Sequence, residues 1–243
     1  MPDIINLNLY KNIDSSYQVV IGQDLINELI VYLKKNWIKN KIVVITDTKV
    51  NKLYGENLVK KFRNQGLDVT FICFEEGEKN KTRKTKHKIE DEMLNLGVSR
   101  DSLIISLGGG VVGDLAGFIS GRFNRGVPYV EIPTTLLAVV DSSIGGKTGV
   151  DTRFGKNLIG AFNQPVKVYI DIDFIETLPR EEYLNGLVEL IKHAIIRDKD
   201  LFYFIEKYRK QILNKEKEVL SYLVKKSCEI KSKIVEKDEK ESG

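Results

Sequence analysis

Cysteine and long apolar runs are scarce in this sequence, and both absences narrow the class of protein. Cys73 and Cys228 are the only cysteines among 243 residues, which argues against a disulfide scaffold and fits a reducing compartment. No window approaches the roughly 18 apolar residues of a membrane span. The N-terminus carries an early acid and lacks the apolar run of a signal peptide. We therefore expect a cytoplasmic protein that does not bind membranes.

The net charge is also small, and histidines are few. The 38 basic and 34 acidic side chains leave a net charge of +4, so we expect no nucleic-acid partner. The two histidines, His87 and His193, form no HExxH motif and no pair, and there is no CxxC. The residues alone therefore do not define a complete metal site, and His87, in a highly charged stretch, is predicted to be solvated.

Apolar runs that alternate with helical spacing predict an α/β fold. Continuous apolar strands are typical of a parallel sheet that is covered on both faces. We expect a hairpin from residues 4–10 and 17–22, and then strands at 41–47, 68–74, 102–107, 129–133 and 166–172. Helices are expected from an Asp24 cap to Trp37, after Asp47 through Lys60, and over 82–96.

The pattern changes at Leu178, because only helical spacing follows. We therefore predict a Rossmann-like α/β domain at residues 1–177 and the start of an all-helical domain at 178–243. In parallel sheets ligands bind at the carboxyl ends of the strands. Asp47, Gly108 to Gly110 and Thr134 are expected at such ends.

The stretch "SLGGGVVGDL" contains G-x-G-x-x-G at Gly108, Gly110 and Gly113, after a predicted strand and before a predicted helix. Glycines let the backbone approach a pyrophosphate, and a helix N-terminus offers free N–H groups to it. A purely structural turn fits the pattern equally well. Asp114 suits a hydroxyl, a cation or the helix N-terminus better than a phosphate, because two negative charges repel.

Residues 133–162 are rich in glycine, serine and threonine and contain the cations Lys147, Arg153 and Lys156, while Arg122 and Arg125 precede them. A loop of this composition can wrap an anion with backbone amides and ammonium groups. The alternative is a solvated surface loop, which the length of the segment disfavours.

Two helical stretches carry polar residues that need an explanation. In "YLNGLVELIKHAII" the predicted apolar stripe is Leu184, Leu187, Val188, Ile191, Ala194 and Ile195. Asn185, Glu189, Lys192 and His193 fall opposite it, most simply as a solvated ion-pair face, although this face could also line a cleft. Lys231 projects within the apolar stripe of the last helix, beside Ser227, and either snorkels to solvent or points to a buried anion.

Five blocks in order resemble the 3-dehydroquinate synthase family. They are "SLGGGVVGDLAGF", "RGVPYVEIPTTLLAVVDSSIGGKTGVD", "GKNLIGAFNQP", "TLPREEYLNGLVELIKHAII" and "EKDEKESG". The resemblance runs from about Lys41 to the last residue, and five ordered blocks make it far more specific than a lone fingerprint.

The resemblance implies an enzyme of the shikimate pathway that uses NAD and a divalent metal, Zn²⁺ or Co²⁺. The family converts 3-deoxy-D-arabino-heptulosonate 7-phosphate into 3-dehydroquinate and phosphate. It does so by transient oxidation of a hydroxyl, elimination of phosphate, reduction, ring opening and ring closure. The substrate partner is thus a small phosphorylated sugar acid, and the family is commonly a homodimer.

The resemblance also implies roles for individual residues. Substrate binding and catalysis are carried over to Arg125, Lys147, Asn157, Lys192, Lys231 and Glu241. Cofactor contacts are carried over to Asp47, Glu76, Gly77, Glu78, Lys81, Gly110, Val111, Val112, Gly113, Asp114, Thr134, Thr135, Asp141, Ser142, Lys147, Lys156, Phe174 and Thr177. Glu189 matches the family's carboxylate metal ligand, which overrides the solvated-face interpretation.

One part of the family pattern has no match within these 243 residues. The family's metal site also uses two histidines, which would follow Glu241, and His193 does not match them. Glu189 alone does not hold zinc, which needs about three protein ligands in a catalytic site. We therefore expect NAD binding but no turnover by the chain alone. The alternatives are another sugar-phosphate cyclase, a polyol dehydrogenase that uses NAD and a metal, and a non-catalytic NAD-binding fragment.

Overall fold

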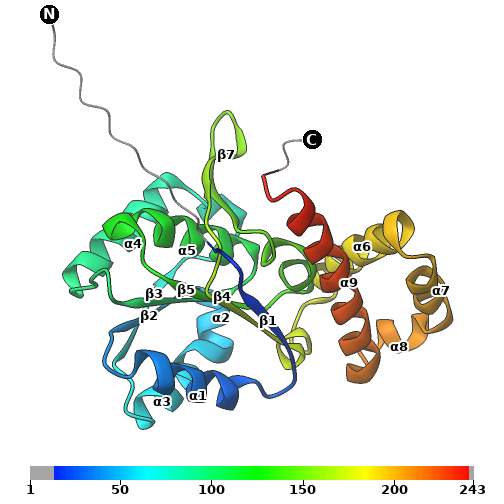
Figure 1. Cartoon of the computed structure of the whole chain (residues 1–243), viewed down its shortest axis with the longest axis horizontal. Helices are drawn as coiled ribbons and strands as arrows, with labels where there is room; N and C mark the ends of the chain where they lie inside the picture. The colour runs from blue at the N-terminus through cyan, green and yellow to red at the C-terminus, as the bar shows by residue number, and fades with distance from the viewer. Residues whose placement is uncertain (1–13, 241–243) are drawn as a thin grey trace, which may run out of the picture.

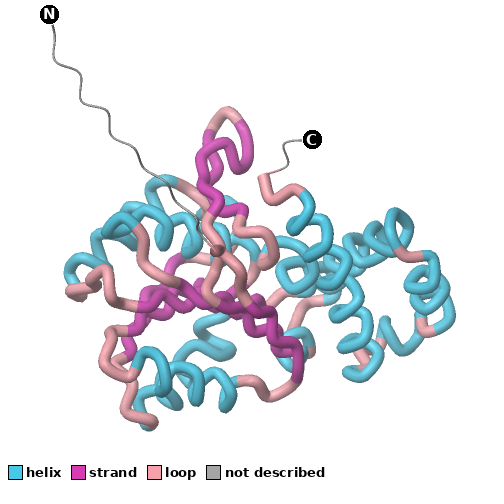
Figure 2. The backbone as a smooth tube through the Cα atoms, in the orientation of Figure 1, coloured by secondary structure: helices cyan, strands magenta, loops and turns pink. Residues whose placement is uncertain are grey.

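A six-stranded parallel sheet forms the centre of the protein (Figures 1 and 2). The computed structural model describes residues 14–240. The strand order is β1-β8-β5-β4-β2-β3, and all neighbouring strands pair in parallel. The strands are β1 (Gln18–Gly22), β2 (Ile42–Asp47), β3 (Val69–Phe74), β4 (Leu103–Gly108), β5 (Tyr129–Pro133) and β8 (Lys167–Asp171). The predicted α/β fold with a parallel sheet is confirmed.

Helices cover both faces of this sheet, as Figure 1 shows. Helices α1 (Ile26–Trp37) and α3 (Glu56–Asn64) pack on one face, and α4 (Arg83–Asn95) and α5 (Gly110–Arg122) pack on the other. Successive residues of β2 alternate between the two cores: Ile42 and Val44 face α1 and α3, whereas Val43 and Ile45 face α4 and α5. This alternation explains why the strand is apolar at every position.

Residues 48–64, between β2 and β3, are helical, in agreement with the helix predicted through Lys60, although they contain a local irregularity. A short helix, α2 (Thr48–Val50), continues through a π-helical turn, η1 (Asn51–Gly55), into α3. The predicted Asp24 cap is wrong, because α1 begins at Ile26 and no side chain caps it. The N–H groups of Asp24 and Leu25 instead donate to the carboxylates of Asp173 and Asp171. The predicted strand at residues 4–10 lies outside the described residues.

Residues 133–162 are not the loop that the composition predicted. They contain a π-helical turn, η4 (Ala138–Ser142), and an antiparallel hairpin of β6 (Lys147–Thr152) and β7 (Gly155–Phe162) that projects from the body of the molecule (Figure 1). Gly149 faces Gly160 across the hairpin, and a Cβ at Gly160 would lie 2.0 Å from the carbonyl oxygen of Thr148. Glycine at these positions lets two paired strands approach each other closely. Composition alone does not distinguish this use of glycine from its use in a loop.

After β8, every regular element of the described chain is helical. These elements are the short turn η5 (Ile172–Ile175) and the helices α6 (Arg180–Arg197), α7 (Lys199–Lys207), α8 (Arg209–Leu213) and α9 (Lys217–Lys237). They share one apolar core with η4 and β8, in which Val139 and Ile170 meet Leu190 and Leu223. The division at residues 177/178 stays a prediction. None of the helices described between residues 14 and 240 is long and apolar enough to cross a membrane.

The orientation of α6 differs from the predicted one. Leu187 and Ala194 are buried, but Val188 and Ile195, which were assigned to the buried stripe, are each 66% exposed. His193, assigned to the solvated face, is buried. Glu189 and His193 therefore face the interior, whereas Asn185 and Lys192 of the same predicted face are exposed, so the solvated-face interpretation is wrong for Glu189 and His193.

Candidate active site at the carboxyl ends of the strands

The carboxyl ends of β2, β3, β4 and β5 meet at a cleft of about 510 Å³, closed on one side by the start of α6. This is the edge at which parallel sheets bind ligands. The cleft contains most of the predicted cofactor residues, namely Asp47, Glu76, Gly77, Glu78, Lys81, Gly110, Val111, Asp114, Thr134, Thr135, Asp141, Ser142 and Thr177.

The glycine stretch forms a tight turn between β4 and α5. Gly109 is the N-cap of α5, and Gly110 is its first residue. A Cβ at Gly108 would lie 2.4 Å from Val112, and one at Gly113 would lie 2.5 Å from Glu131 Oε1. The turn therefore requires glycine for space, and it leaves the first N–H groups of α5 directed at the cleft, as an anion site requires.

Lys81 and Asp114 form a buried ion pair beside this turn. Lys81 Nζ also donates to Asn157 Oδ1 at 2.6 Å, so one ammonium joins α5 to the β6–β7 hairpin. Burial raises the pKa of Asp114 to about 6, and the Lys81 charge opposes this rise. The prediction that Asp114 suits a cation or hydroxyl agrees with this pairing.

Asp47 and the segment after β3 form the far wall of the cleft. Asp47 accepts a hydrogen bond from the Val50 N–H at 2.8 Å, and burial raises the pKa of its carboxyl. The Glu76 N–H donates to Thr48 Oγ1 at 3.2 Å. Glu78 pairs with Lys156 of the hairpin at 2.9 Å. Carboxylates at this position can accept hydrogen bonds from hydroxyl groups, such as those of a ribose.

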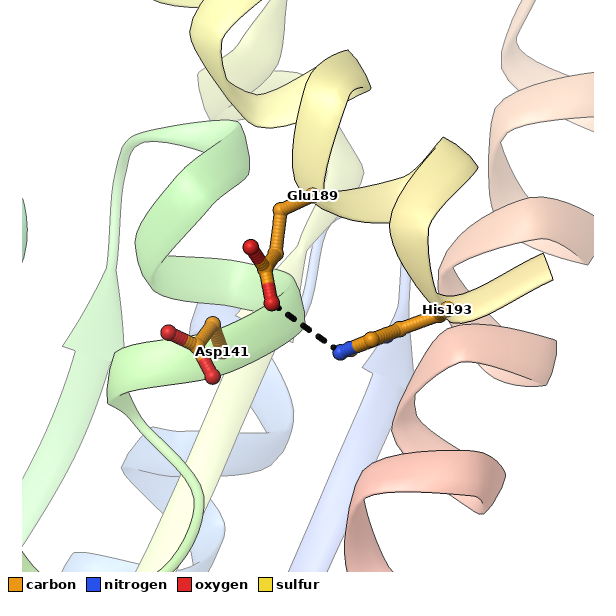
Figure 3. Close-up of side chains that lie close together, drawn as sticks. All are labelled: Asp141, Glu189 and His193. Carbon is orange, nitrogen blue, oxygen red and sulfur yellow. Dashed lines mark ion pairs between the residues drawn. The ribbon is translucent and has the colours of Figure 1, made fainter. Parts of the chain in front are cut away.

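Asp141 of η4 lines the opposite end of the cleft, and Glu189 and His193 of α6 lie beside Asp141 (Figure 3). One ligand atom from each lies within 4.8 Å of the others, and His193 Nε2 lies 3.2 Å from Glu189 Oε1. Lys192 pairs with Glu189, and Lys231 of α9 pairs with Asp141 at 2.5 Å. The anomalous lysine in the apolar stripe thus points to an anion, and snorkelling to solvent is ruled out.

Several predicted residues lie apart from the cleft wall. Val112 is in the core behind the turn, Gly113 packs on Glu131, and Phe174 contacts the cleft residue Tyr54 edge-on at 4.7 Å between ring centroids. Lys147 and Lys156 lie on the hairpin, and Lys156 contacts the cleft through Glu78. Arg125 is exposed in η3 (Phe123–Arg125), at the far end of α5 from the glycine turn, so this structure does not bring it to the cleft. Glu241 lies outside the described residues.

Sequence reasoning missed some residues of the cleft. Lys49 and Tyr54 line it, as do Leu137 and Glu182. Lys49 and Tyr54 were detectable in principle, because they follow the strand end at Asp47. His193 was dismissed because its spacing from Glu189 is typical of a solvated helix face.

The sequence matches two family models along most of its length. Residues 71–185 match the N-terminal model of 3-dehydroquinate synthase, and residues 186–243 match the C-terminal model. The 3-dehydroquinate synthase of Thermodesulfovibrio yellowstonii is 42% identical over 95% of this chain and 64% of its own length. That of Thermoanaerobacter sp. (strain X514) is 44% identical over 99% of this chain and 67% of its own length. The chain thus spans about two thirds of the length of these curated relatives.

Solved structures share the fold. The 2-epi-5-epi-valiolone synthase of Streptomyces hygroscopicus subsp. jinggangensis, solved with NAD⁺ and Zn²⁺ bound, has a TM-score of 0.88 and 26% identity. The similarity covers 98% of this chain and 65% of that one. A 2-deoxy-scyllo-inosose synthase, complexed with carbaglucose-6-phosphate, NAD⁺ and Co²⁺, has a TM-score of 0.69 and 24% identity over 84% of this chain and 59% of that one. The two family models and the relatives at over 40% identity agree, and the chain belongs to the 3-dehydroquinate synthase family.

Proposed function

We propose that the cleft binds NAD and part of a phosphorylated sugar-acid substrate. The reaction is the conversion of 3-deoxy-D-arabino-heptulosonate 7-phosphate into 3-dehydroquinate and phosphate. The observation that carries the proposal is that one cleft joins the glycine turn at Gly110 to the acidic residue Asp141. A dinucleotide site and a cluster of acid, imidazole and ammonium groups thereby lie next to each other.

The residues around the glycine turn fit a dinucleotide. A Cβ at Gly109 would lie 2.9 Å from Thr135, and one at Gly110 would lie 3.2 Å from Ser142 Oγ, so side chains there would fill the space that a pyrophosphate needs. Ser142 Oγ is buried without a hydrogen-bond partner among the described residues, which suits a ligand hydroxyl or amide. Asp47 and Asp114 would accept hydrogen bonds from ribose hydroxyls. NAD supplies a hydride acceptor that is restored in the same turnover.

The other end of the cleft fits a divalent metal and an anionic substrate. Glu189 would be a metal ligand, as the family resemblance implies, and the related synthase solved with Zn²⁺ supports zinc. A bound metal lowers the pKa of a substrate hydroxyl that it contacts. Lys192 and Lys231 would hold the carboxylate or phosphate of the substrate, and Asn157 would stay oriented by Lys81. The homodimer and the roles of Lys147, Arg125 and Glu241 remain predictions from the resemblance, and the cytoplasmic location remains a prediction from the scarcity of cysteine.

A titration of the chain with NAD tests the dinucleotide site, with binding followed by calorimetry. We expect Asp114→Asn to weaken NAD about tenfold or more, because a hydrogen bond to a charged group contributes about 1.5–3 kcal/mol. Asp91→Asn, on the exposed side of α4, is the matched control and should bind NAD unchanged. Equal NAD affinity in both variants would contradict the assignment of Asp114.

Phosphate release from 3-deoxy-D-arabino-heptulosonate 7-phosphate tests turnover. The resemblance predicts none from residues 1–243 alone, and normal turnover would overturn that prediction. A second candidate, a cyclase acting on a different sugar phosphate, rests on the TM-score of 0.88 to 2-epi-5-epi-valiolone synthase. Thermal unfolding of the chain with each type of substrate distinguishes these candidates. The type that binds raises the unfolding temperature, because a bound ligand stabilises the folded chain.

A further inference from the structure

Lys215 has a backbone conformation that lysine rarely adopts. It lies in the loop between α8 and α9 with a φ of 58°, in the left-handed region that is usually occupied by glycine at the end of a helix. Its N–H donates to the carbonyl oxygen of Ile212 at 3.0 Å, which closes the end of α8. Glycine would make the same turn with less strain, so a lysine here indicates that the side chain has a use beyond the turn.

The ammonium group of Lys215 binds three backbone carbonyl groups of a distant segment. Its Nζ donates to the carbonyl oxygens of Ile175, Glu176 and Leu178 at 3.2, 3.0 and 2.7 Å. The ring centroid of Tyr183 lies 5.2 Å from the same Nζ. An ammonium group has three N–H donors, so one is available for each carbonyl group. A cation is also favoured at the carboxyl end of a helical turn such as η5.

These carbonyl groups flank Thr177, which lines the cleft described above. Two of them precede Thr177 in the chain, and the third follows it. The Thr177 hydroxyl contacts the hydroxyl of Tyr54, which lines the same cleft. Lys215 therefore fixes the backbone on both sides of a residue whose side chain belongs to the cleft wall.

We propose that Lys215 is a positioning residue of the NAD site, which holds Thr177 against Tyr54 through the backbone carbonyl groups on either side of Thr177. The proposal rests on the proposed function, because it assigns a role in NAD binding. Lys215 lies outside the cleft lining that the described residues form, so it acts on the cofactor only through this segment. The loop between α8 and α9 thereby sets the position of one wall of the cofactor site.

Lys217, two residues further along the chain, contacts the same segment in a different way. Its Nζ pairs with the carboxylates of Asp173 and Glu176 at 2.7 and 2.8 Å, and the three side chains are 39%, 36% and 54% exposed. Exposed ion pairs between long side chains constrain the backbone little, because the side chains can rotate. The groups that Lys215 binds belong to the backbone itself, so this contact fixes the path of the chain beside Thr177.

NAD titrations of the full chain, followed by calorimetry, test the proposal in two variants. Lys215→Met removes the ammonium group and keeps a long side chain, whereas Lys215→Gly removes it and also suits the left-handed backbone. We expect both to weaken NAD binding by about threefold to tenfold, which is the size of effect that residues without ligand contact have on a site. Lys210→Met, at an exposed position of α8, is the charge-matched control and should bind NAD as the native chain does.

Thermal unfolding of the same variants separates positioning from stability. Because glycine relieves the backbone strain, Lys215→Gly should unfold at a higher temperature than Lys215→Met and yet bind NAD no better. An NAD affinity that follows the unfolding temperature, or that stays native in Lys215→Gly, would overturn the proposal.

A double-mutant cycle tests the route through Thr177. If Lys215 acts through Thr177, then Thr177→Val weakens NAD binding in the native chain but has little further effect in Lys215→Gly. Asp114→Asn, in α5, should have its full effect in both backgrounds. Additive losses for Thr177→Val and Lys215→Gly, or native affinity in Thr177→Val, would contradict this route. Absence of NAD binding by the native chain refutes the proposed function, whereas equal NAD affinity in the native chain and Lys215→Gly refutes only the role of Lys215.

Discussion

Replacing Glu131 with glutamine should stabilise the protein at neutral pH. Glu131 lies in β5, one of the two central strands of the sheet, paired with Ser106 of β4 and Val168 of β8, and it is 5% exposed. Its Oε1 lies beneath the glycine turn, against Gly113. Burial raises the pKa of Glu131 to about 8, and the nearby Asp114 charge adds to the rise.

The size of this stabilisation follows from the difference in proton binding between the folded and the unfolded chain. The carboxyl has an ordinary pKa of 4.5 and one of about 8 in the folded chain, so at pH 7 the folded protein holds a proton that the unfolded chain has released. Stability therefore falls as pH rises from 4.5 to 8. At about 1.4 kcal/mol per pH unit, the loss at pH 7 is about 3 kcal/mol. Glutamine has the size of the protonated acid and is also neutral. It does not titrate, so the variant does not lose this stability as the pH rises.

Urea unfolding at pH 4.5 and pH 7 measures the effect. We expect Glu131→Gln to raise the free energy of unfolding by about 3 kcal/mol at pH 7 and to change it little at pH 4.5. Glu92→Gln, at an exposed position of α4, should show no such pH-dependent gain. A gain that is equal at both pH values, or a loss at pH 7, would refute the reasoning.

Two further predictions concern contacts around the cleft. Lys81→Met should destabilise the chain by about 3 kcal/mol at pH 7.5, because it leaves the buried Asp114 carboxylate without its partner. Thermal unfolding should show a smaller deficit at pH 5, where Asp114, with its pKa of about 6, is protonated. Gly160→Ala should open the β6–β7 hairpin, because the new Cβ would lie 2.0 Å from the Thr148 carbonyl oxygen. Faster proteolytic cleavage within residues 147–162 is the expected result, and unchanged cleavage would show that the strands can separate at little cost.

The sheet was predictable because its strands are buried on both faces. β2 and β4 are apolar at nearly every position, and that pattern has few explanations other than a covered parallel strand. The hairpin was not predictable in the same way. Gly149 and Gly160 come into contact only when the two strands are paired. A short window of sequence does not reveal that contact.

The candidate site, like the fold, was predictable only in part. The glycine turn and Asp47 were found because a strand end fixes where they lie. The role of α6 was misjudged from hydrophobicity, which favoured Val188 and Ile195 as buried residues, although both are exposed. What buries His193 is Ser227, 34 residues further along the chain, together with Asp141 of a different element. Hydrophobic periodicity describes one helix at a time, so it does not reveal the partners that tertiary packing brings to that helix.

The ion pairs of the cleft explain how a metal and an anionic substrate could favour each other's binding. In the chain as it stands, Lys231 neutralises Asp141 and Lys192 neutralises Glu189. A metal ion bound by Glu189, as proposed above, would take this carboxylate from Lys192, so that ammonium group would lose its partner and become available to an anion. Inorganic phosphate should therefore bind more tightly when zinc is present, and phosphate should strengthen zinc binding by the same factor, since coupling between two sites is reciprocal. Lys192→Gln should abolish the part of this coupling that passes through Lys192, because no ammonium group is then released from Glu189.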